Sequence, residues 1–174
     1  MVRAALASKR RIDQGPVLGA AYVPAASVVI ASLVSCLPLV VESGWSPDFG
    51  FLVLIAWRLF RQDVWPSWWA APLGLFNDMI SGYPIGLSVS LWTASMLALD
   101  LLDRRTMWRD YWIEWVLAAL LILIGESAQW QVARWMGASV PFSAMIPPLI
   151  ISIAAFPVAA WLVSRIDRRL GRQP

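Results

Sequence analysis

Three ionisable residues interrupt long apolar stretches of this 174-residue chain and are the first candidates for chemistry. They are Asp78, Glu126 and Arg134. A charged side chain inside a membrane-spanning helix is costly, so it commonly marks a binding site, a proton path or a contact between helices. We expect a polar cluster, with Asp78 or Glu126 against Arg134, that binds a ligand, carries protons or docks a partner helix. The alternative is a purely structural role, in which interhelical bonds contribute roughly 1 kcal/mol each.

Glu126 also begins a polar stripe on its own predicted helix. Trp130 and Arg134 follow at intervals of four residues, and Gln129 lies beside Glu126 at an interval of three. Residues at these spacings share one helical face. We expect this face to point toward other helices, where Glu126, Gln129 and Arg134 form an intramembrane polar cluster.

The densest signal is the stretch from Pro72 to Ser88, which reads PLGLFNDMISGYPIGLS. Glycines permit close backbone approach and proline ends one helix and opens the next, so the stretch predicts two helices joined by a tight turn. Broken helices in membranes often mark binding sites because their free backbone groups need partners. A second reading is structural, with Asp78 bound to backbone amides at the start of the next helix, where the helix dipole favours a carboxylate.

The chain lacks the residues that several kinds of site chemistry require. The chain has no histidine and a single cysteine, Cys36, so the ligand sets of zinc, haem and iron–sulfur sites are missing. It contains neither a phosphate-binding glycine-lysine loop nor a Gly-x-Ser-x-Gly nucleophile motif. A hydrolase that uses Asp78 with Glu126 has no further motif in its favour. We expect no enzyme, no cofactor and no metal.

Composition identifies the elements that must hold these residues. The chain is 59% hydrophobic and 14% charged, with a mean hydropathy of +0.64, whereas soluble domains are about 25% charged. A membrane-spanning helix needs roughly 20 apolar residues. We predict an all-α, polytopic membrane protein forming one domain over 1–174, with basic tails at 1–16 and 165–174. The six predicted spans are residues 17–41, 48–60, 66–80, 84–101, 112–135 and 142–164.

The basic residues predict how the chain lies in the membrane. Cytoplasmic segments are enriched in lysine and arginine. With both termini in the cytoplasm, the inner segments hold thirteen of the fourteen basic residues and only Arg134 lies outside. A re-entrant hairpin over 48–80 would instead bury Arg58, Arg61 and Asp63, at about 2.5–3.5 kcal/mol each. The scattered basic residues do not form the single basic face typical of nucleic-acid binding.

Smaller charged groups are predicted to be structural. Arg58 is close to the inner interface, where we expect its side chain to extend toward water. Asp100 and Asp103, beside Arg104 and Arg105, predict an interfacial charge cluster. The stretch LVSC at 33–36 is similar to a lipoprotein cleavage site. However, the apolar run at 17–41 is longer than the 7–15 residues typical of a signal peptide, so we expect it to be retained.

Taken together, the chain resembles the family of the rod shape-determining protein MreD. The likeness rests on size, on the six predicted spans and on a motif similar to Gly-Leu-x-x-Asp-x-x-Ser-Gly-x-Pro-x-Gly. The matching residues are Gly74, Asp78, Ser81, Gly82, Pro84 and Gly86, with Asn77 beside Asp78. The motif covers less than a tenth of the chain, and the predicted topology carries the likeness elsewhere.

The resemblance implies a non-enzymatic scaffold in the bacterial inner (cytoplasmic) membrane. Such a protein binds MreC and acts with RodA, a class B penicillin-binding protein and the MreB filament in cell-wall synthesis and rod shape. The MreD family also looks like the substrate-binding S-components of energy-coupling-factor transporters in its six-helix arrangement. That likeness gives the alternative function, binding of a vitamin-like molecule. It requires an outward pocket lined by Asp78, Glu126, Gln129 and Arg134.

Overall fold

The computed structural model describes residues 18–35, 47–60, 66–103 and 111–170, and within these ranges every regular element is a helix. Two short 3-10 helices, η1 (Ser67–Trp69) and η2 (Phe142–Met145), precede longer helices. The six α-helices are α2 (Leu18–Ser35), α4 (Phe49–Phe60), α5 (Ala70–Ser81), α6 (Leu87–Asp103), α7 (Tyr111–Trp135) and α8 (Ile146–Leu170). Each overlaps one of the six predicted apolar stretches, so the all-helical fold class is confirmed for the described residues.

The ends of the helices differ from the predictions in three places. The third stretch is α-helical only from Ala70, because residues 67–69 form a 3-10 turn after Pro66. The fourth begins at Leu87, since Pro84 to Gly86 belong to the turn. The sixth continues to Leu170, so residues 165–170 of the predicted tail are helical. The tail at 1–16, residues 36–41 and Cys36 lie outside the described residues.

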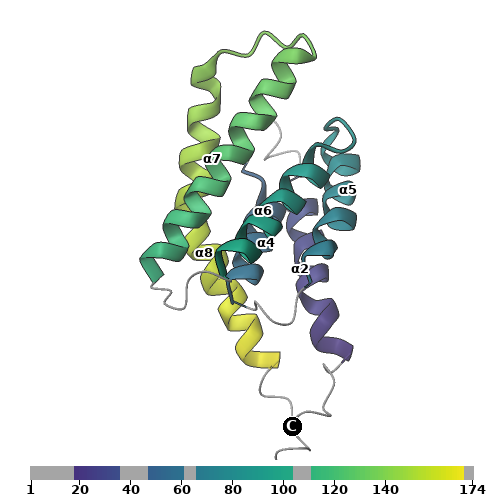
Figure 1. Ribbon diagram of the computed structural model, residues 1–174, viewed down its shortest axis with the longest axis vertical. Helices are drawn as coiled ribbons and strands as arrows, with labels where there is room; N and C mark the ends of the chain where they lie inside the picture. Colours follow the sequence, from purple (N-terminus) through teal and green to yellow (C-terminus); the bar gives the residue numbers. More distant parts are fainter. Residues whose placement is uncertain (1–17, 36–46, 61–65, 104–110, 171–174) are drawn as a thin grey trace, which may run out of the picture.

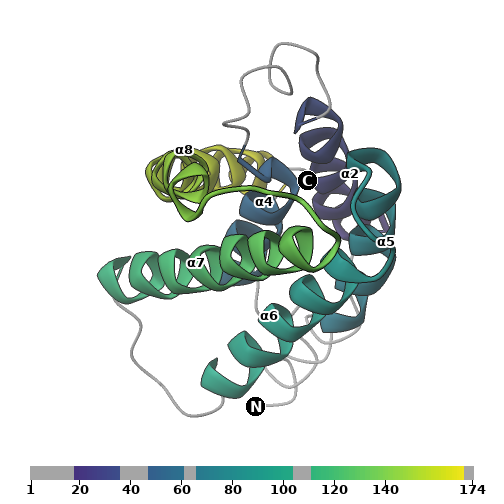
Figure 2. The same ribbon diagram turned by 90° about the horizontal axis from the view of Figure 1, so that it is seen from above.

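Helix α4 lies at the centre of the bundle (Figures 1 and 2). It contacts α2 and α8 along its length and also touches α6 and α7. Its sequence, FGFLVLIAWRLF, contains no charged or polar side chain other than Arg58, as expected of a helix surrounded by others. All residues from Gly50 to Leu59 are buried, including Trp57 and Arg58. This short helix forms the core of the fold.

The other helices pack around α4 as two pairs and one single helix. Helices α5 and α6 form a close hairpin, and α7 and α8 lie side by side and extend past the other helices in Figure 1. Helix α2 contacts both α4 and α5, so residues 18–35 are part of the folded bundle.

Two helical segments are long and apolar enough to cross a membrane, Trp112–Trp135 and Phe142–Arg169. Twelve-residue helices such as α4 and α5 rise only about 18 Å at 1.5 Å per residue, which is less than the hydrocarbon core of about 30 Å. Large apolar side chains are also exposed along α7, including Val116, Leu120 and Ile124.

Candidate functional site

The motif from Gly74 to Gly86 forms the α5–α6 hairpin. Gly82 ends α5 in the left-handed conformation, with φ of 70°, and Gly86 precedes α6 with φ of 103°. Both values are readily reached only by glycine. Pro84 lies between them, and its carbonyl accepts a hydrogen bond from the amide of Leu87 at 3.1 Å. The turn is therefore formed by Gly82, Pro84 and Gly86, the residues from which it was predicted.

Gly74 brings the two helices of the hairpin together. A Cβ atom at this position would lie 2.8 Å from the carbonyl oxygen of Ser88 and 2.8 Å from the Cα of Val89. Backbone atoms cannot move aside as a flexible side chain can, so only glycine fits. Ser81 is the last residue of α5, directly before the turn.

Asp78 joins the two helices through the backbone. One carboxylate oxygen accepts a hydrogen bond from the amide of Gly86 and the other from the amide of Ser88, both at 2.8 Å. These amides belong to the start of α6, where backbone N–H groups have no partner in the helix and the dipole favours negative charge. The Asp78 side chain is buried. This geometry agrees with a structural role for Asp78, in which its carboxylate binds backbone amides at the start of the next helix.

Asp78 belongs to a wider group of polar residues, which we call the hairpin cluster. Its four members are Asp48, Asn77, Asp78 and Ser88. The side-chain amide of Asn77 donates to the Ser88 hydroxyl at 3.1 Å and to the Asp48 carboxylate at 3.5 Å. Asp48 also accepts a hydrogen bond from the amide of Phe51 at 3.0 Å, as an N-cap of α4 does. The hairpin cluster thus connects the start of α4 to both helices of the hairpin.

A second polar group lies at the opposite end of α4, and we call it the arginine cluster. Arg58 pairs with Asp100, through Nε at 3.0 Å and through Nη2, and with Asp103 through Nη2 at 2.8 Å. The hydroxyl of Ser67 in η1 donates to the other oxygen of Asp100. Only 4% of the Arg58 side chain is exposed. The prediction that Arg58 extends toward water is therefore wrong, because two carboxylates of α6 hold it inside the bundle.

The second predicted group of residues is spread along α7. Glu126 accepts a hydrogen bond from the Ser152 hydroxyl of α8 at 3.4 Å. The guanidinium of Arg134 lies 5.1 Å from the centroid of the Trp130 ring, close to the α7–α8 turn. Gln129 is half-buried on the same helix. Among the described residues, Arg134 forms no ion pair with Asp78 or Glu126, so the expected arrangement of these charges is not found.

Two cavities bear on ligand binding. One, of about 510 Å³, lies at the α7–α8 turn and is lined by Trp130, Arg134 and residues 137–142. It contains Arg134 but not Asp78, Glu126 or Gln129. The other, of about 470 Å³, is apolar and lies between α2, α4 and α8. Within the described parts of the chain, no group of three or more histidine, cysteine or acidic side chains could hold a metal ion.

Asp48 is a member of the site that was not predicted from the sequence. Its signal was available, since an aspartate directly before an apolar helical run is typical of an N-cap. The pairing of Arg58 with Asp100 had no local signal, because 42 residues separate the two.

The chain matches no protein-family model, no curated protein and no solved structure in the three comparisons.

Proposed function

We propose that this protein is a non-enzymatic scaffold of the bacterial elongation machinery, which binds MreC in the inner membrane. The observation that carries the proposal is the use of the motif residues. Gly74, Gly82 and Gly86 shape the hairpin, and Asp78 binds two of its amides. Because these residues build a rigid element, the motif is better suited to presenting a surface to a partner than to catalysis.

The surface that the hairpin presents is apolar. Met79 and Ile85 are 72% and 80% exposed, at the end of α5 and in the turn. Exposed apolar side chains on a rigid element are suited to contact a partner's transmembrane helix. We assign MreC binding to this end of the hairpin.

The membrane placement in the proposal is six spans with both termini in the cytoplasm. Only 17% and 28% of the most apolar windows of the two long segments are buried inside the protein, which is unlike the core helix of a soluble domain. The basic residues, thirteen of fourteen on one predicted side, favour the cytoplasmic termini. The two twelve-residue helices, α4 and α5, need a locally thinned bilayer in this placement.

The alternative is an S-component that binds a vitamin-like molecule. The cavity beside Trp130 and Arg134 favours it, because it combines an aromatic ring and a guanidinium at the predicted outer end of α7. It lacks the carboxylates that the alternative was expected to use, so the scaffold remains the better supported function.

Co-purification of the tagged protein tests the proposal. We expect MreC and cell-wall synthases to be recovered with the wild type and lost with Ile85→Ser. The matched control is Ile150→Ser, which removes another exposed isoleucine, on α8, and should keep the complex. If MreC is absent, or if both variants bind it equally, the proposal is wrong. A stoichiometric small molecule recovered with transporter ATPases would favour the S-component.

A further inference from the structure

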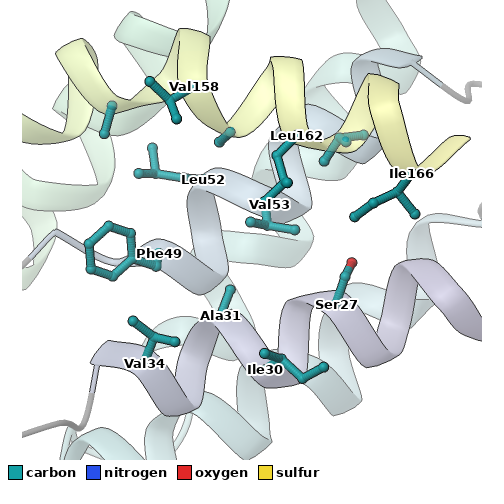
Figure 3. A pocket seen from close by; sticks show the side chains of 13 residues that line it. Ser27, Ile30, Ala31, Val34, Phe49, Leu52, Val53, Val158, Leu162 and Ile166 are labelled. Carbon is teal, nitrogen blue, oxygen red and sulfur yellow. The ribbon is translucent and has the colours of Figure 1, made fainter.

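The apolar cavity between α2, α4 and α8 is partly open to the outside and forms a groove, and Figure 3 shows the side chains that line it. Helices α2 and α8 form its walls and α4 its floor. Aliphatic side chains such as Ile30, Val34, Val158 and Leu162 line it (Figure 3). None of its residues belongs to α5 or α6, so the groove is separate from the hairpin surface to which we assign MreC.

The described residues of the groove offer little to a polar ligand. Ser27 is the single polar residue among the described residues that line it. Its hydroxyl already donates to the carbonyl of Pro24 and accepts from the indole of Trp57, both at 2.7 Å. An occupant must therefore be apolar along its whole length in the groove.

The dimensions favour a narrow occupant. The lining residues of α8 extend from Ala155 to Ile166, about 16 Å at 1.5 Å per residue. A helix with its side chains is about 10–12 Å across and would fill about 1,250–1,800 Å³ over that length. The empty space in the groove is about 1080 Å³ even with its open side included, which suits an extended acyl chain better than a whole helix.

A positive charge lies at one end of the groove. Arg169 follows Ile166 by three residues, which places it on the same face of α8 one turn further along. It is exposed, and helical side chains lean back toward the N-terminus of their helix, here toward the groove. Arg165 flanks the same end, with its guanidinium 5.1 Å from the Trp161 ring. Arg168 turns away and donates instead to the carbonyl of Ser164 at 3.2 Å.

We propose that an anionic phospholipid occupies this site, with an acyl chain in the groove and its phosphate at Arg169. Basic residues beside an apolar groove at the cytoplasmic surface provide both the charge and the chain contact that such a lipid needs. The inference rests on the proposed membrane placement, which puts the end of α8 at the inner leaflet. It does not depend on the role in cell-wall synthesis.

Native mass spectrometry of the detergent-purified protein tests the site, with phosphatidylglycerol and phosphatidylcholine of identical acyl chains as probes. We expect the wild type to retain phosphatidylglycerol preferentially. Arg169→Gln should lower its retention roughly fivefold, the contribution expected of one basic residue near a membrane surface. Arg168→Gln removes an equal charge one residue away. It should lower the retention of phosphatidylglycerol by less than about 2.2-fold, which is half the Arg169→Gln effect on a logarithmic scale.

A second pair of variants tests the groove. Ala159→Phe fills it and should reduce retention of both lipids, whereas Ala154→Phe lies on an exposed part of α8 outside the groove and should leave retention unchanged. Equal effects of the two arginine variants, or full retention by Ala159→Phe, would overturn the proposal. So would loss of a protein partner from Ala159→Phe with lipid retention intact, because the occupant would then be a helix. Each result is independent of whether MreC co-purifies, so failure of the scaffold proposal is seen separately.

Discussion

Asp78 is the residue whose chemistry is most closely defined by its surroundings. Its two oxygens each accept one backbone amide of α6, in a buried position. A carboxylate with both oxygens engaged in this way positions helices. The geometry of the hairpin therefore explains why an aspartate stands at this position.

We predict that Asp78→Ala destabilises the protein by about 1.5–3 kcal/mol, the range for a lost hydrogen bond to a charged group. Two amides at the start of α6 lose their partner, and water cannot readily replace it. Unfolding in mixed detergent micelles measures the change. Ser90→Ala is the control, because the Ser90 hydroxyl is exposed and bonds only to the carbonyl of Leu87. Equal stability of Asp78→Ala and the wild type would contradict the structural role.

The arginine cluster gives a second prediction. Arg58→Ala removes the pairing of this guanidinium with Asp100 and Asp103, and breaking a buried ion pair in this way costs about 3–5 kcal/mol. Combining Arg58→Leu with Asp100→Asn and Asp103→Asn removes all three charges and should recover most of the lost stability. Thermal unfolding of the two variants in the same detergent compares them. A triple variant no more stable than Arg58→Ala would show that charge pairing is not what holds α4 to α6.

The two clusters differ in how far sequence could predict them. Asp78 precedes the turn by four residues and the next helix by nine, so its bond to that helix could be anticipated from local spacing alone. Arg58 and Asp100 meet only because α4 and α6 pack together, and no local pattern encodes that contact. The same holds for Glu126, whose partner Ser152 is 26 residues away on α8.

At the scale of the helices, apolar run length predicted which segments are helical, and local turn chemistry corrected their ends. Pro84 and Gly86 delay the start of α6 to Leu87, and the charged end of α8 remains helical to Leu170 because nothing in residues 165–170 breaks a helix. The lengths of the apolar stretches could not predict that α4 lies at the centre of the bundle. That position depends on which faces of the neighbouring helices are apolar and close enough to pack.

The contact between α5 and α6 can be tested at Gly74. We expect Gly74→Ala to separate the helices and destabilise the protein by about 1–3 kcal/mol, as overpacking does. Gly125→Ala on α7 is the matched control, since its Cβ would meet the Phe51 ring at 3.3 Å, and a side chain can shift where backbone cannot. Unfolding midpoints of the two variants compare them. Equal midpoints would mean that the hairpin tolerates a wider spacing.

At the scale of the whole molecule, α4 is fixed at both ends by polar clusters and along its length by apolar packing. Asp48 caps its start within the hairpin cluster, and Arg58 binds α6 near its end. Both clusters include residues of α6, so the hairpin and the central helix form one rigid unit. The lipid groove lies on the other side of α4, against α8. This separation allows the bundle to bind a partner on one side and a lipid on the other.

The orientation of this unit in the membrane is the last prediction. In a Cys36→Ser background, Ser139→Cys in the α7–α8 turn should react with a membrane-impermeant maleimide in spheroplasts, because that turn is exposed and carries the predicted outer end of α7. Gln62→Cys and Gln173→Cys should be protected there and react in inverted vesicles, since the basic residues assign both positions to the cytoplasm. A re-entrant segment over 48–80 would leave Gln62→Cys unreactive from the cytoplasmic side. Reaction of Gln173→Cys in spheroplasts would instead reverse the orientation and place Arg169 at the outer leaflet.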